Sequence, residues 1–339
     1  MLRKSYFVVA LLSILLSIVL WSGIATSQTE QPAAKSYLDA REYVNKGGYS
    51  DALPLLRKAV SDSAGFVEAQ YNLGFTYEKL NILDSAGVAY GAALSLDSTL
   101  VGAHFGLSTI ALRTQDYATA VKHLRKATEL DSTSAEAFFS LGAALDQTND
   151  LDGAIVALRK AIQIKPDYVD AHYQLAATLS RKAASAQDYP DVIAAFKKAL
   201  ELDSTHANAS TAHFSVARMY AAMKQNDQAI SSADEAIKIK PDLFQAYFVK
   251  GNALTALGKD DEAIAAYKKA IEKRQNYGSA HFALGRLYQK KEQWQLALKE
   301  YKAAAQDTTS PQVPAAKKAA KQIEDYLKQT AAQGATQGK

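Results

Sequence analysis

The stretch "AFFSLGAALDQTNDLDGAIVALRKAIQIKPD", Ala137 to Asp167, contains two helical patterns separated by a short polar break. In the first pattern, Phe138, Leu141 and Leu145 recur at the three- and four-residue spacing that is typical of one face of an α-helix. The second pattern stops at Pro166, because proline lacks a backbone N–H and cannot continue a helix. The stretch therefore predicts two helices joined by a short turn, that is, a helical hairpin.

The same hairpin pattern recurs along the chain with a period close to 34 residues. One alanine on each second helix is followed by the next at separations of 34, 34, 34, 38, 37, 34 and 34 residues, and a second ladder lies seven positions earlier. Self-similarity at this period is typical of a solenoid, in which each hairpin buries its apolar face against its neighbours. The two ladders are Ala59, Ala93, Ala127, Ala161, Ala199, Ala236, Ala270 and Ala304, and Ala52, Ala86, Ala120, Ala154, Val192, Ala229, Ala263 and Ala297.

Small residues also recur on the first helices, among them Gly74, Gly142, Gly251 and Gly285. Two helices approach closely only where their side chains are small, and a larger residue there overpacks the contact at a cost of about 1 to 3 kcal/mol. We expect these residues to face the alanines of the second helices, so that small faces small across each hairpin.

These features resemble the tetratricopeptide repeat (TPR) family. A Leu-Gly pair on the first helix, alanines on the second and a stop at Pro166, at Pro241 or at "LDST" all recur at the family's period, and "YNLGFTYEKLNILDSAGVAYGAALSLD" (71–97) shows the pattern well. The resemblance implies an all-α fold, an α-α superhelix (TPR solenoid) of about eight helical hairpins with a C-terminal capping helix. It is specific for the fold and carries little information about the partner.

The repeats organise most of the chain. Extra residues near "KAASAQDYPD" and "HANA" are either neutral loop insertions or a local change in the superhelical path. After the last repeat, apolar residues share one face of an amphipathic segment that can cap the solenoid, and a small, polar tail follows. The predicted parts are a signal peptide or signal anchor (1–27), a linker (28–32), eight TPR units (33–66, 67–100, 101–134, 135–168, 169–206, 210–243, 244–277 and 278–311), a capping helix (312–330) and a disordered tail (331–339).

The N-terminal segment reads as an export signal. Arg3 and Lys4 precede the apolar run Tyr6–Trp21, and Ala25 with Ser27 offers a small-x-small cleavage site. The alternative is an uncleaved anchor, because residues 6–25 supply about the length that crosses a bilayer. We therefore expect a periplasmic or secreted protein after signal cleavage, or one anchored in the inner membrane and facing the periplasm.

Composition excludes several classes of function. The formal charge is +4, with 39 basic and 35 acidic residues and no long run of one sign, which argues against a nucleic-acid partner. The chain has no cysteine, so lipoprotein attachment, disulfides and thiolate metal sites are excluded. Membrane contact is expected only through the N-terminal segment, if that segment stays uncleaved.

Four histidines recur at one position of the repeat. His104, His172, His213 and His281 each hold the fourth position of a first helix, where another unit has Phe138. Neighbouring helix axes stand about 8 to 10 Å apart, whereas metal-bound nitrogens converge at about 2.1 Å from one ion. We interpret these histidines as structural and expect no metal site and no cofactor. With no Gly-rich phosphate loop or paired-carboxylate motif either, the prediction is a non-catalytic protein.

An aromatic residue holds the fifth position of every unit. The resemblance implies that this face lines a concave groove where partner segments dock; alternatively, the rings pack between successive first helices. The candidate groove rings are Tyr71, Phe105, Phe139, Tyr173, Phe214, Phe248 and Phe282.

Beside the last three rings, Arg218, Asn252 and Arg286 hold one position of three successive units. Arginine forks can bind carboxylates and the amide can bind the backbone of an extended segment, although a solvated polar face is the alternative. The sequence thus predicts a non-catalytic protein–protein interaction scaffold of the bacterial envelope, binding protein or peptide segments in the groove. The alternative is an inner-membrane-anchored accessory subunit of an envelope or glycan synthesis or export complex.

Overall fold

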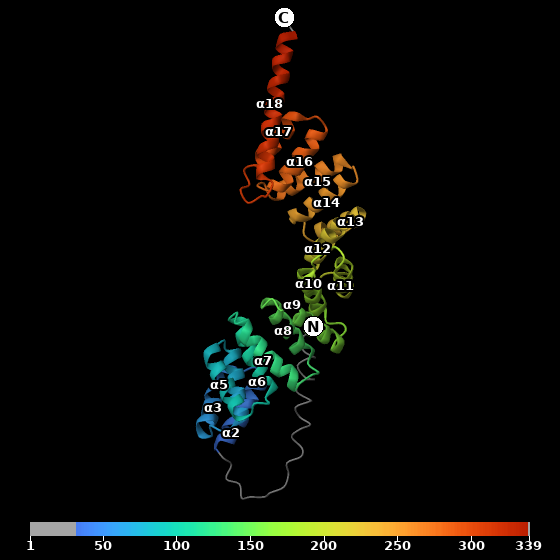
Figure 1. Cartoon of the computed structure of the whole chain (residues 1–339). Helices are drawn as coiled ribbons and strands as arrows, with labels where there is room; N and C mark the ends of the chain where they lie inside the picture. Colours follow the sequence, from blue (N-terminus) through green and yellow to red (C-terminus); the bar gives the residue numbers. More distant parts are fainter. Residues whose placement is uncertain (1–31, 338–339) are drawn as a thin grey trace. The chain divides into compact units, whose positions relative to one another are not determined.

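The computed structural model describes residues 32–337, which form seventeen helices and no strand (Figure 1). This confirms the predicted all-α class. The predicted signal or anchor lies outside the described residues, as does nearly all of the linker. None of the helices within 32–337 combines the length and the apolar character that crossing a bilayer requires.

The helices alternate along the chain as first and second members of eight successive pairs, followed by one longer helix. In chain order they are α2 (Pro32–Asn45), α3 (Tyr49–Asp62), α4 (Val67–Lys79), α5 (Leu83–Leu96), α6 (Val101–Arg113), α7 (Tyr117–Leu130), α8 (Ala135–Gln147), α9 (Leu151–Ile164), α10 (Val169–Lys182), α11 (Tyr189–Leu202), α12 (Ala209–Ala222), α13 (Asn226–Ile239), α14 (Phe244–Ala256), α15 (Asp260–Lys273), α16 (Gly278–Lys290), α17 (Trp294–Ala304) and α18 (Val313–Gln337).

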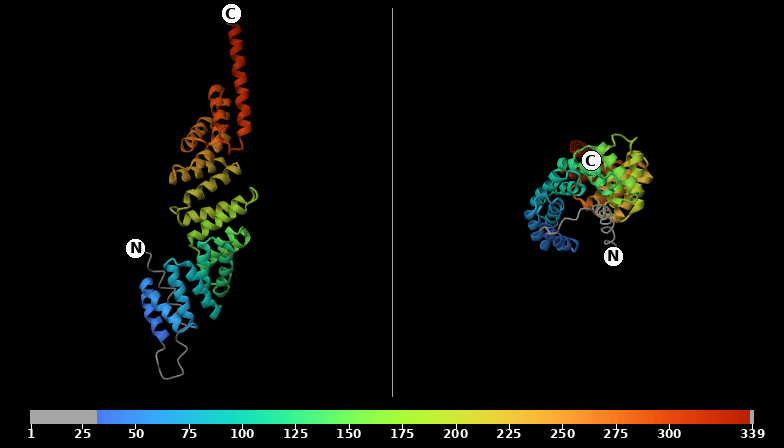
Figure 2. Two further views of the ribbon diagram at one scale, coloured as in Figure 1. Left: turned by 90° about the vertical axis from the view of Figure 1, so that its left-hand side faces the viewer. Right: turned by 90° about the horizontal axis from the view of Figure 1, so that it is seen from below.

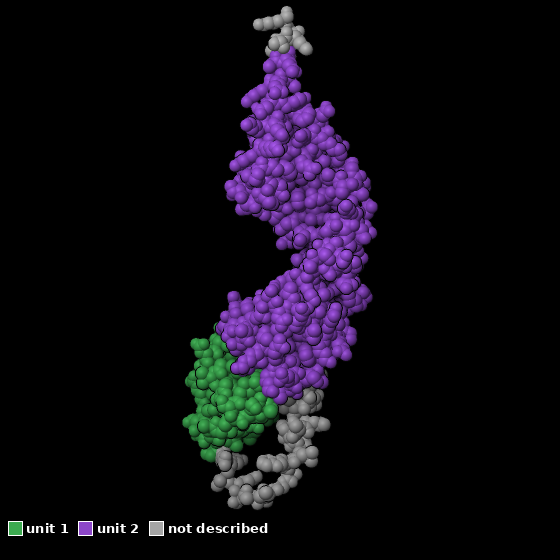
Figure 3. Space-filling model, viewed as in Figure 1, with its two compact units in different colours: residues 1–110 green, residues 111–339 purple. Residues whose placement is uncertain are grey.

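The chain divides into two compact units, residues 1–110 (unit 1) and 111–339 (unit 2), coloured separately in Figure 3. In unit 1, α2 packs against α3, α3 against α4, and α4 against α5. In unit 2, α8 packs against α9, α14 against α15, and α18 against α17 (Figure 2). Within unit 2, α7, α9, α11, α13 and α15 each also contact the first helix of the pair that follows.

The two ladders of small residues form the inner seam of the repeats. All fifteen ladder alanines have an exposed fraction of 0%, and Val192 is 1% exposed. Alanine recurs at these positions because the helices are packed closely there, and any added methyl group must displace packed atoms. The predicted burial of both ladders is confirmed.

The small residues on the first helices behave differently from the prediction. A Cβ atom placed on Gly74 would lie 2.7 Å from Cδ1 of Tyr90, and one placed on Gly251 would lie 2.5 Å from Cε1 of Tyr267. These glycines therefore face tyrosine rings of the second helix rather than alanines, and the expectation that small faces small is wrong at these positions. The helical period identified the face, but not the side chain that fills the space beside it.

The turn inside most hairpins requires one residue with left-handed backbone. Asn81, Asn149 and Glu292 have φ of 61°, 64° and 58°, and Gly47 and Gly258 hold the same position in their own turns. The next N–H then donates to the carbonyl five residues back, as from Ile82 to Tyr77 at 2.8 Å, which closes the first helix in a Schellman-type motif.

The "LDST" stops act as predicted. At Asp97 the carboxylate Oδ1 accepts from the Thr99 hydroxyl at 2.6 Å and from the Thr99 backbone N–H at 2.8 Å, and these bonds lower the pKa of Asp97. Asp131 bonds Thr133 in the same way. Side chains that bind the local backbone compete with helix continuation, so one helix ends and the next begins.

The two insertions are both held by local contacts. In the first, Asp188 Oδ2 accepts from the backbone N–H groups of Ala184 and Ser185 at 3.0 and 2.9 Å, which closes the turn before α11. In the second, His206 stacks on Tyr173 with centroids 4.4 Å apart. Both insertions lie within unit 2.

The last helix is longer than predicted. Ala316, Ala320 and Ile323 are buried as the cap prediction requires. However, α18 continues to Gln337, whereas the prediction ended the cap at 330 and assigned 331–339 to a disordered tail. The segment "AAQGATQ" is rich in alanine and glutamine, which are good helix formers, and it extends a helix that is already nucleated.

Candidate functional site: two cavities of unit 2

Several of the aromatic rings predicted to line a groove pack between successive first helices. The ring centroids of Phe139 and Tyr168 lie 5.0 Å apart, and those of Phe248 and Tyr277 lie 5.1 Å apart. Tyr168 and Tyr277 are the residues that precede α10 and α16. The packing alternative therefore applies to these rings, and it does not prevent the same ring from lining a cavity.

Four of the predicted groove rings line neither of the two cavities described below. Tyr71 lies against Gly102, where an added Cβ would come 2.7 Å from the Tyr71 hydroxyl oxygen, and burial raises the pKa of Tyr71. Tyr173 is buried and donates its hydroxyl to the Asp203 carbonyl at 2.8 Å. Phe105 and Phe139 are half-buried.

The first cavity, which we call the Phe248 cavity, has a volume of about 340 Å³. It brings together four predicted site residues from α12 and α14, and the Arg218 guanidinium carbon lies 5.8 Å from the centroid of the Phe214 ring. This is a cation–π distance, and it holds the guanidinium at the wall of the cavity. The lining residues are Phe214, Arg218, Ala221, Gln245, Phe248, Val249, Asn252 and Tyr277.

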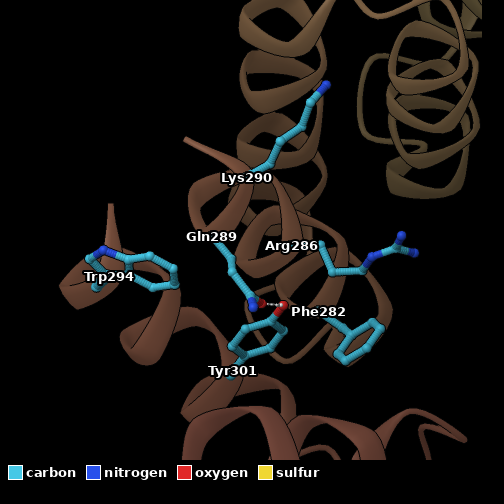
Figure 4. Close-up of a pocket in the computed structure, with 6 residues that line it drawn as sticks. All are labelled: Phe282, Arg286, Gln289, Lys290, Trp294 and Tyr301. Carbon is cyan, nitrogen blue, oxygen red and sulfur yellow. Dashed lines mark hydrogen bonds between the residues drawn. The ribbon is translucent and has the colours of Figure 1, made fainter. Parts of the chain in front are cut away.

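The second cavity, which we call the Trp294 cavity, has a volume of about 550 Å³. Its lining residues come from the last pair of helices, α16 and α17. Figure 4 shows a hydrogen bond from Tyr301 to Gln289, with Trp294 on one side and Phe282 and Arg286 on the other. Of its lining residues, only Phe282 and Arg286 were predicted from the sequence.

The free positive charge of each cavity comes from one arginine. Arg218 and Arg286 are both exposed, and among residues 32–337 neither guanidinium forms an ion pair. Lys290 also lines the Trp294 cavity, but its ammonium lies 2.6 Å from the Asp260 carboxylate and is neutralised there. Each cavity thus combines apolar rings with one unpaired guanidinium, which suits a ligand that carries both apolar and anionic groups.

Tyrosines of the second helices complete the polar side of both cavities. The Tyr301 hydroxyl donates to Gln289 Oε1 at 2.7 Å, and the Tyr267 hydroxyl donates to Asn252 Oδ1 at 2.8 Å. Burial raises the pKa of both tyrosines, so each hydroxyl keeps its proton. These bonds fix the orientation of amides that line the cavities.

Sequence reasoning missed Tyr277, Gln289, Trp294 and Tyr301. For Tyr301 a usable signal exists: a glycine on the first helix is followed sixteen residues later by tyrosine in three units, as Gly74 and Tyr90, Gly251 and Tyr267, and Gly285 and Tyr301. The recurrence of this spacing indicates that the tyrosine ring of the second helix fills the space that the glycine leaves on the first helix. No comparable pattern identifies Trp294.

Three of the four repeated histidines form a hydrogen bond to the backbone just before their own helix. The Nε2 atoms of His104, His172 and His281 lie 3.1, 2.9 and 2.8 Å from the carbonyl oxygen six residues earlier. Tyr247, at the same position of its unit, donates its hydroxyl to the Pro241 carbonyl at 3.3 Å. For His213, burial lowers the pKa below its usual value. Over residues 32–337, no group of three or more His, Cys, Asp or Glu side chains has a geometry that could hold a metal ion.

Three sequence profiles of one repeat family match the chain. A profile described as TPR repeat matches residues 147–182 and 251–292, and one described as tetratricopeptide repeat matches 37–99 and 178–244. A third, also described as tetratricopeptide repeat, matches 101–134. Together these matches cover more than half of the chain.

Several solved structures are similar to this chain over half of its length or more. YrrB, described as a TPR protein with an unusual peptide-binding site, matches with a TM-score of 0.51 and 22% identity over 56% of this chain and 95% of its own. MamA of Desulfovibrio magneticus RS-1 matches with a TM-score of 0.48 and 21% identity over 53% of this chain and 99% of its own. Yeast Tom70 matches with a TM-score of 0.45 and 16% identity over 90% of this chain and 67% of its own.

The likeness to YrrB agrees with the repeat architecture expected from the sequence, an α-α superhelix of helical hairpins. The family matches and the ladder of buried alanines lead to the same assignment. The chain belongs to the tetratricopeptide repeat family, whose repeats support protein-interaction scaffolds.

Proposed function

We propose that this protein is an exported, non-catalytic scaffold of a bacterial envelope, and that it binds extended segments of partner proteins through the Phe248 and Trp294 cavities. The proposal combines the export-type N-terminal sequence with the site geometry of unit 2. The apolar rings of each cavity would contact side chains of the bound segment, and the arginine would bind a carboxylate in a bidentate fork.

The observation that carries this proposal is the pair of unpaired guanidinium groups, one beside each cavity. A charged group without a partner among residues 32–337, held next to an aromatic ring, is free to bind an incoming anion. Both cavities are open rather than enclosed and are lined partly by aromatic rings, which fits side chains of a polypeptide better than a small metabolite that must be enclosed.

Replacement of both arginines tests the proposal. The double variant Arg218→Ala/Arg286→Ala should capture envelope proteins at least tenfold more weakly than the native chain, because a charge-assisted hydrogen bond contributes about 1.5 to 3 kcal/mol. Arg159→Ala, which removes the same charge from an exposed position of α9, is the control and should capture normally. Equal capture by the double variant and the native chain would show that the arginines of the two cavities do not bind the partner.

A second candidate rests on the length of the N-terminal apolar run. If residues 6–25 stay in the inner membrane, the same repeats would serve as an anchored accessory subunit of an envelope or glycan synthesis or export complex. N-terminal sequencing of the protein from fractionated cells separates the two candidates: an N-terminus near Gln28 supports the exported scaffold, and an intact Met1 in the membrane fraction supports the anchored subunit.

A further inference from the structure

The glycines of the first helices leave space for a tyrosine of the second helix, whose hydroxyl then reaches the residues that line the cavity. A Cβ atom on Gly285 would lie 3.0 Å from the ring of Tyr301, and one on Gly251 would lie 2.5 Å from the ring of Tyr267. Because no side chain fills these positions, each tyrosine ring passes its first helix and carries its hydroxyl to the residue that lines the cavity, Gln289 or Asn252.

The repeat in unit 1 shows which partner donates in this contact. There the Tyr90 hydroxyl lies 2.8 Å from Glu78 Oε2, which holds the same position in its unit as Gln289 in the last one. An ionised carboxylate only accepts hydrogen bonds, so Tyr90 is the donor. By equivalence of position, Tyr301 donates to Gln289, and the amide oxygen Oε1 is the atom that faces the tyrosine.

This assignment determines what each amide can still offer. A primary amide has one carbonyl oxygen and one NH2 group, and the oxygens of Gln289 and Asn252 each accept a hydrogen bond from a tyrosine hydroxyl, which fixes the orientation of the amide. The Tyr267 hydroxyl also lies 3.1 Å from Thr255 Oγ1, but the Thr255 hydroxyl donates to the Gly251 carbonyl at 2.8 Å, and the Tyr267 proton goes to the closer Asn252 Oδ1. Each cavity therefore has an oriented NH2 group and a guanidinium among its lining residues, and both groups are donors.

We propose that Tyr301 and Tyr267 are positioning residues that hold the NH2 groups of Gln289 and Asn252 beside the arginines of the two cavities, so that these cavities select an acidic, extended polypeptide segment over a neutral one. This inference rests on the proposed function and adds the chemistry of the partner. A carboxylate carries a negative charge and two oxygens that can accept from a guanidinium and an amide NH2 at once, whereas a neutral side-chain amide offers these donors a single uncharged oxygen.

The acidic group that pairs with a lining residue of the Trp294 cavity is the Asp260 carboxylate, which lies 2.6 Å from the Lys290 ammonium. Asp260 therefore neutralises the charge of Lys290 and leaves the charge of Arg286 in the Trp294 cavity unpaired. In the Phe248 cavity the lining residues include no acidic side chain. Charge complementarity thus favours a carboxylate in both places.

An array of extended peptides in matched pairs tests the inference, with the members of each pair differing only by Glu for Gln. We expect the native chain to prefer the Glu members, and Tyr301→Phe and Tyr267→Phe to lower the Glu-to-Gln binding ratio by about 3- to 10-fold, the effect of one hydrogen bond. Phenylalanine keeps the ring in the glycine gap and removes only the hydroxyl. Tyr90→Phe makes the same change in unit 1 and is the matched control, which should leave the ratio unchanged.

A second variant checks the direction of the effect. Gln289→Glu keeps an acceptor for Tyr301 but removes the NH2 group and adds a negative charge, as at Glu78, so it should abolish the preference for Glu peptides. If the native chain prefers Glu but the preference survives in Tyr301→Phe and Gln289→Glu, the inference is wrong while the proposed function stands. If the native chain binds the peptides without preferring Glu, the carboxylate-binding role of the arginines is wrong as well. If no peptide of any pair binds, both are wrong.

Discussion

Gly251 and Gly91 both lie inside helices, yet a side chain at the two positions would meet very different surroundings. An added Cβ at Gly251 would overlap the fully buried ring of Tyr267, whereas at Gly91 nothing lies within 4 Å. The repeat period predicts that both helices need a buried face, but the contact that makes glycine necessary depends on which side chain the opposing helix presents. That information is three-dimensional, and so the sequence could indicate the position of small residues without indicating their role.

Paired glycine substitutions test this difference. Gly251→Ala should lower the free energy of unfolding by about 1 to 3 kcal/mol, because the methyl group must displace the Tyr267 ring from a packed site. Gly91→Ala, in the open environment of α5, should raise it by about 0.5 to 1 kcal/mol, because alanine loses less backbone entropy on folding. Chemical denaturation of both variants measures the two effects; a similar loss in both would show that ring contact is not what requires glycine.

At the scale of elements, the two ion pairs that α10 forms with the preceding pair of helices, α8 and α9, differ in how far they are buried. Arg181 of α10 pairs with Asp146 of α8, whose side chain is only 5% exposed and whose Oδ1 has no other partner among residues 32–337. Its neighbour Lys182 pairs with Asp152, and both of those side chains are at least half exposed. The alternation of first and second helices could be predicted from the sequence, whereas the burial that distinguishes these two pairs could not.

The two pairs should respond differently to truncation of the cation. Arg181→Ala leaves the Asp146 carboxylate buried and unpaired, which should cost about 1 to 3 kcal/mol of stability. Lys182→Ala should cost about 0.5 kcal/mol or less, because solvent screens an exposed pair. Thermal unfolding of the two variants side by side gives the comparison, and equal shifts would mean that burial of Asp146 has no energetic role.

The contact between α16 and α17 includes a histidine with two acceptors. His281 Nδ1 lies 2.6 Å from Glu300 Oε2 and its Nε2 lies 2.8 Å from the Gln275 carbonyl, so the doubly protonated ring satisfies both. Burial alone lowers the pKa of His281, but the bonds to Glu300 and to the Gln275 carbonyl outweigh it and raise the pKa above its usual 6.5.

A raised folded pKa sets the sign of the pH dependence. The pair contributes fully to stability below about pH 6.5, the pKa of an unfolded histidine, and the contribution is lost as the pH rises through the higher folded value. The native chain should therefore lose more Tm between about pH 6 and pH 9 than Glu300→Gln does. If the two proteins show parallel pH profiles, His281 does not titrate as described.

At the scale of the whole molecule, regular repetition explains which site residues could be predicted. Residues at one position of successive units share a face, and the cavities of unit 2 accordingly contain Phe214, Arg218, Phe248 and Asn252 in one case and Phe282 with Arg286 in the other. Residues that enter from a second helix or from a turn do not follow that rule. For this reason Trp294 and Tyr301 emerged only from the structure.

Site-specific photo-crosslinking in cells tests the central claim, that partners bind at these cavities, most directly. The crosslinking residue p-benzoylphenylalanine replaces Phe282 in the Trp294 cavity or, as a control in the same unit, Val156 on the exposed side of α9. The account predicts a discrete protein adduct from position 282 that is absent from position 156. An adduct from position 156 alone, or the same adducts from both positions, would contradict it.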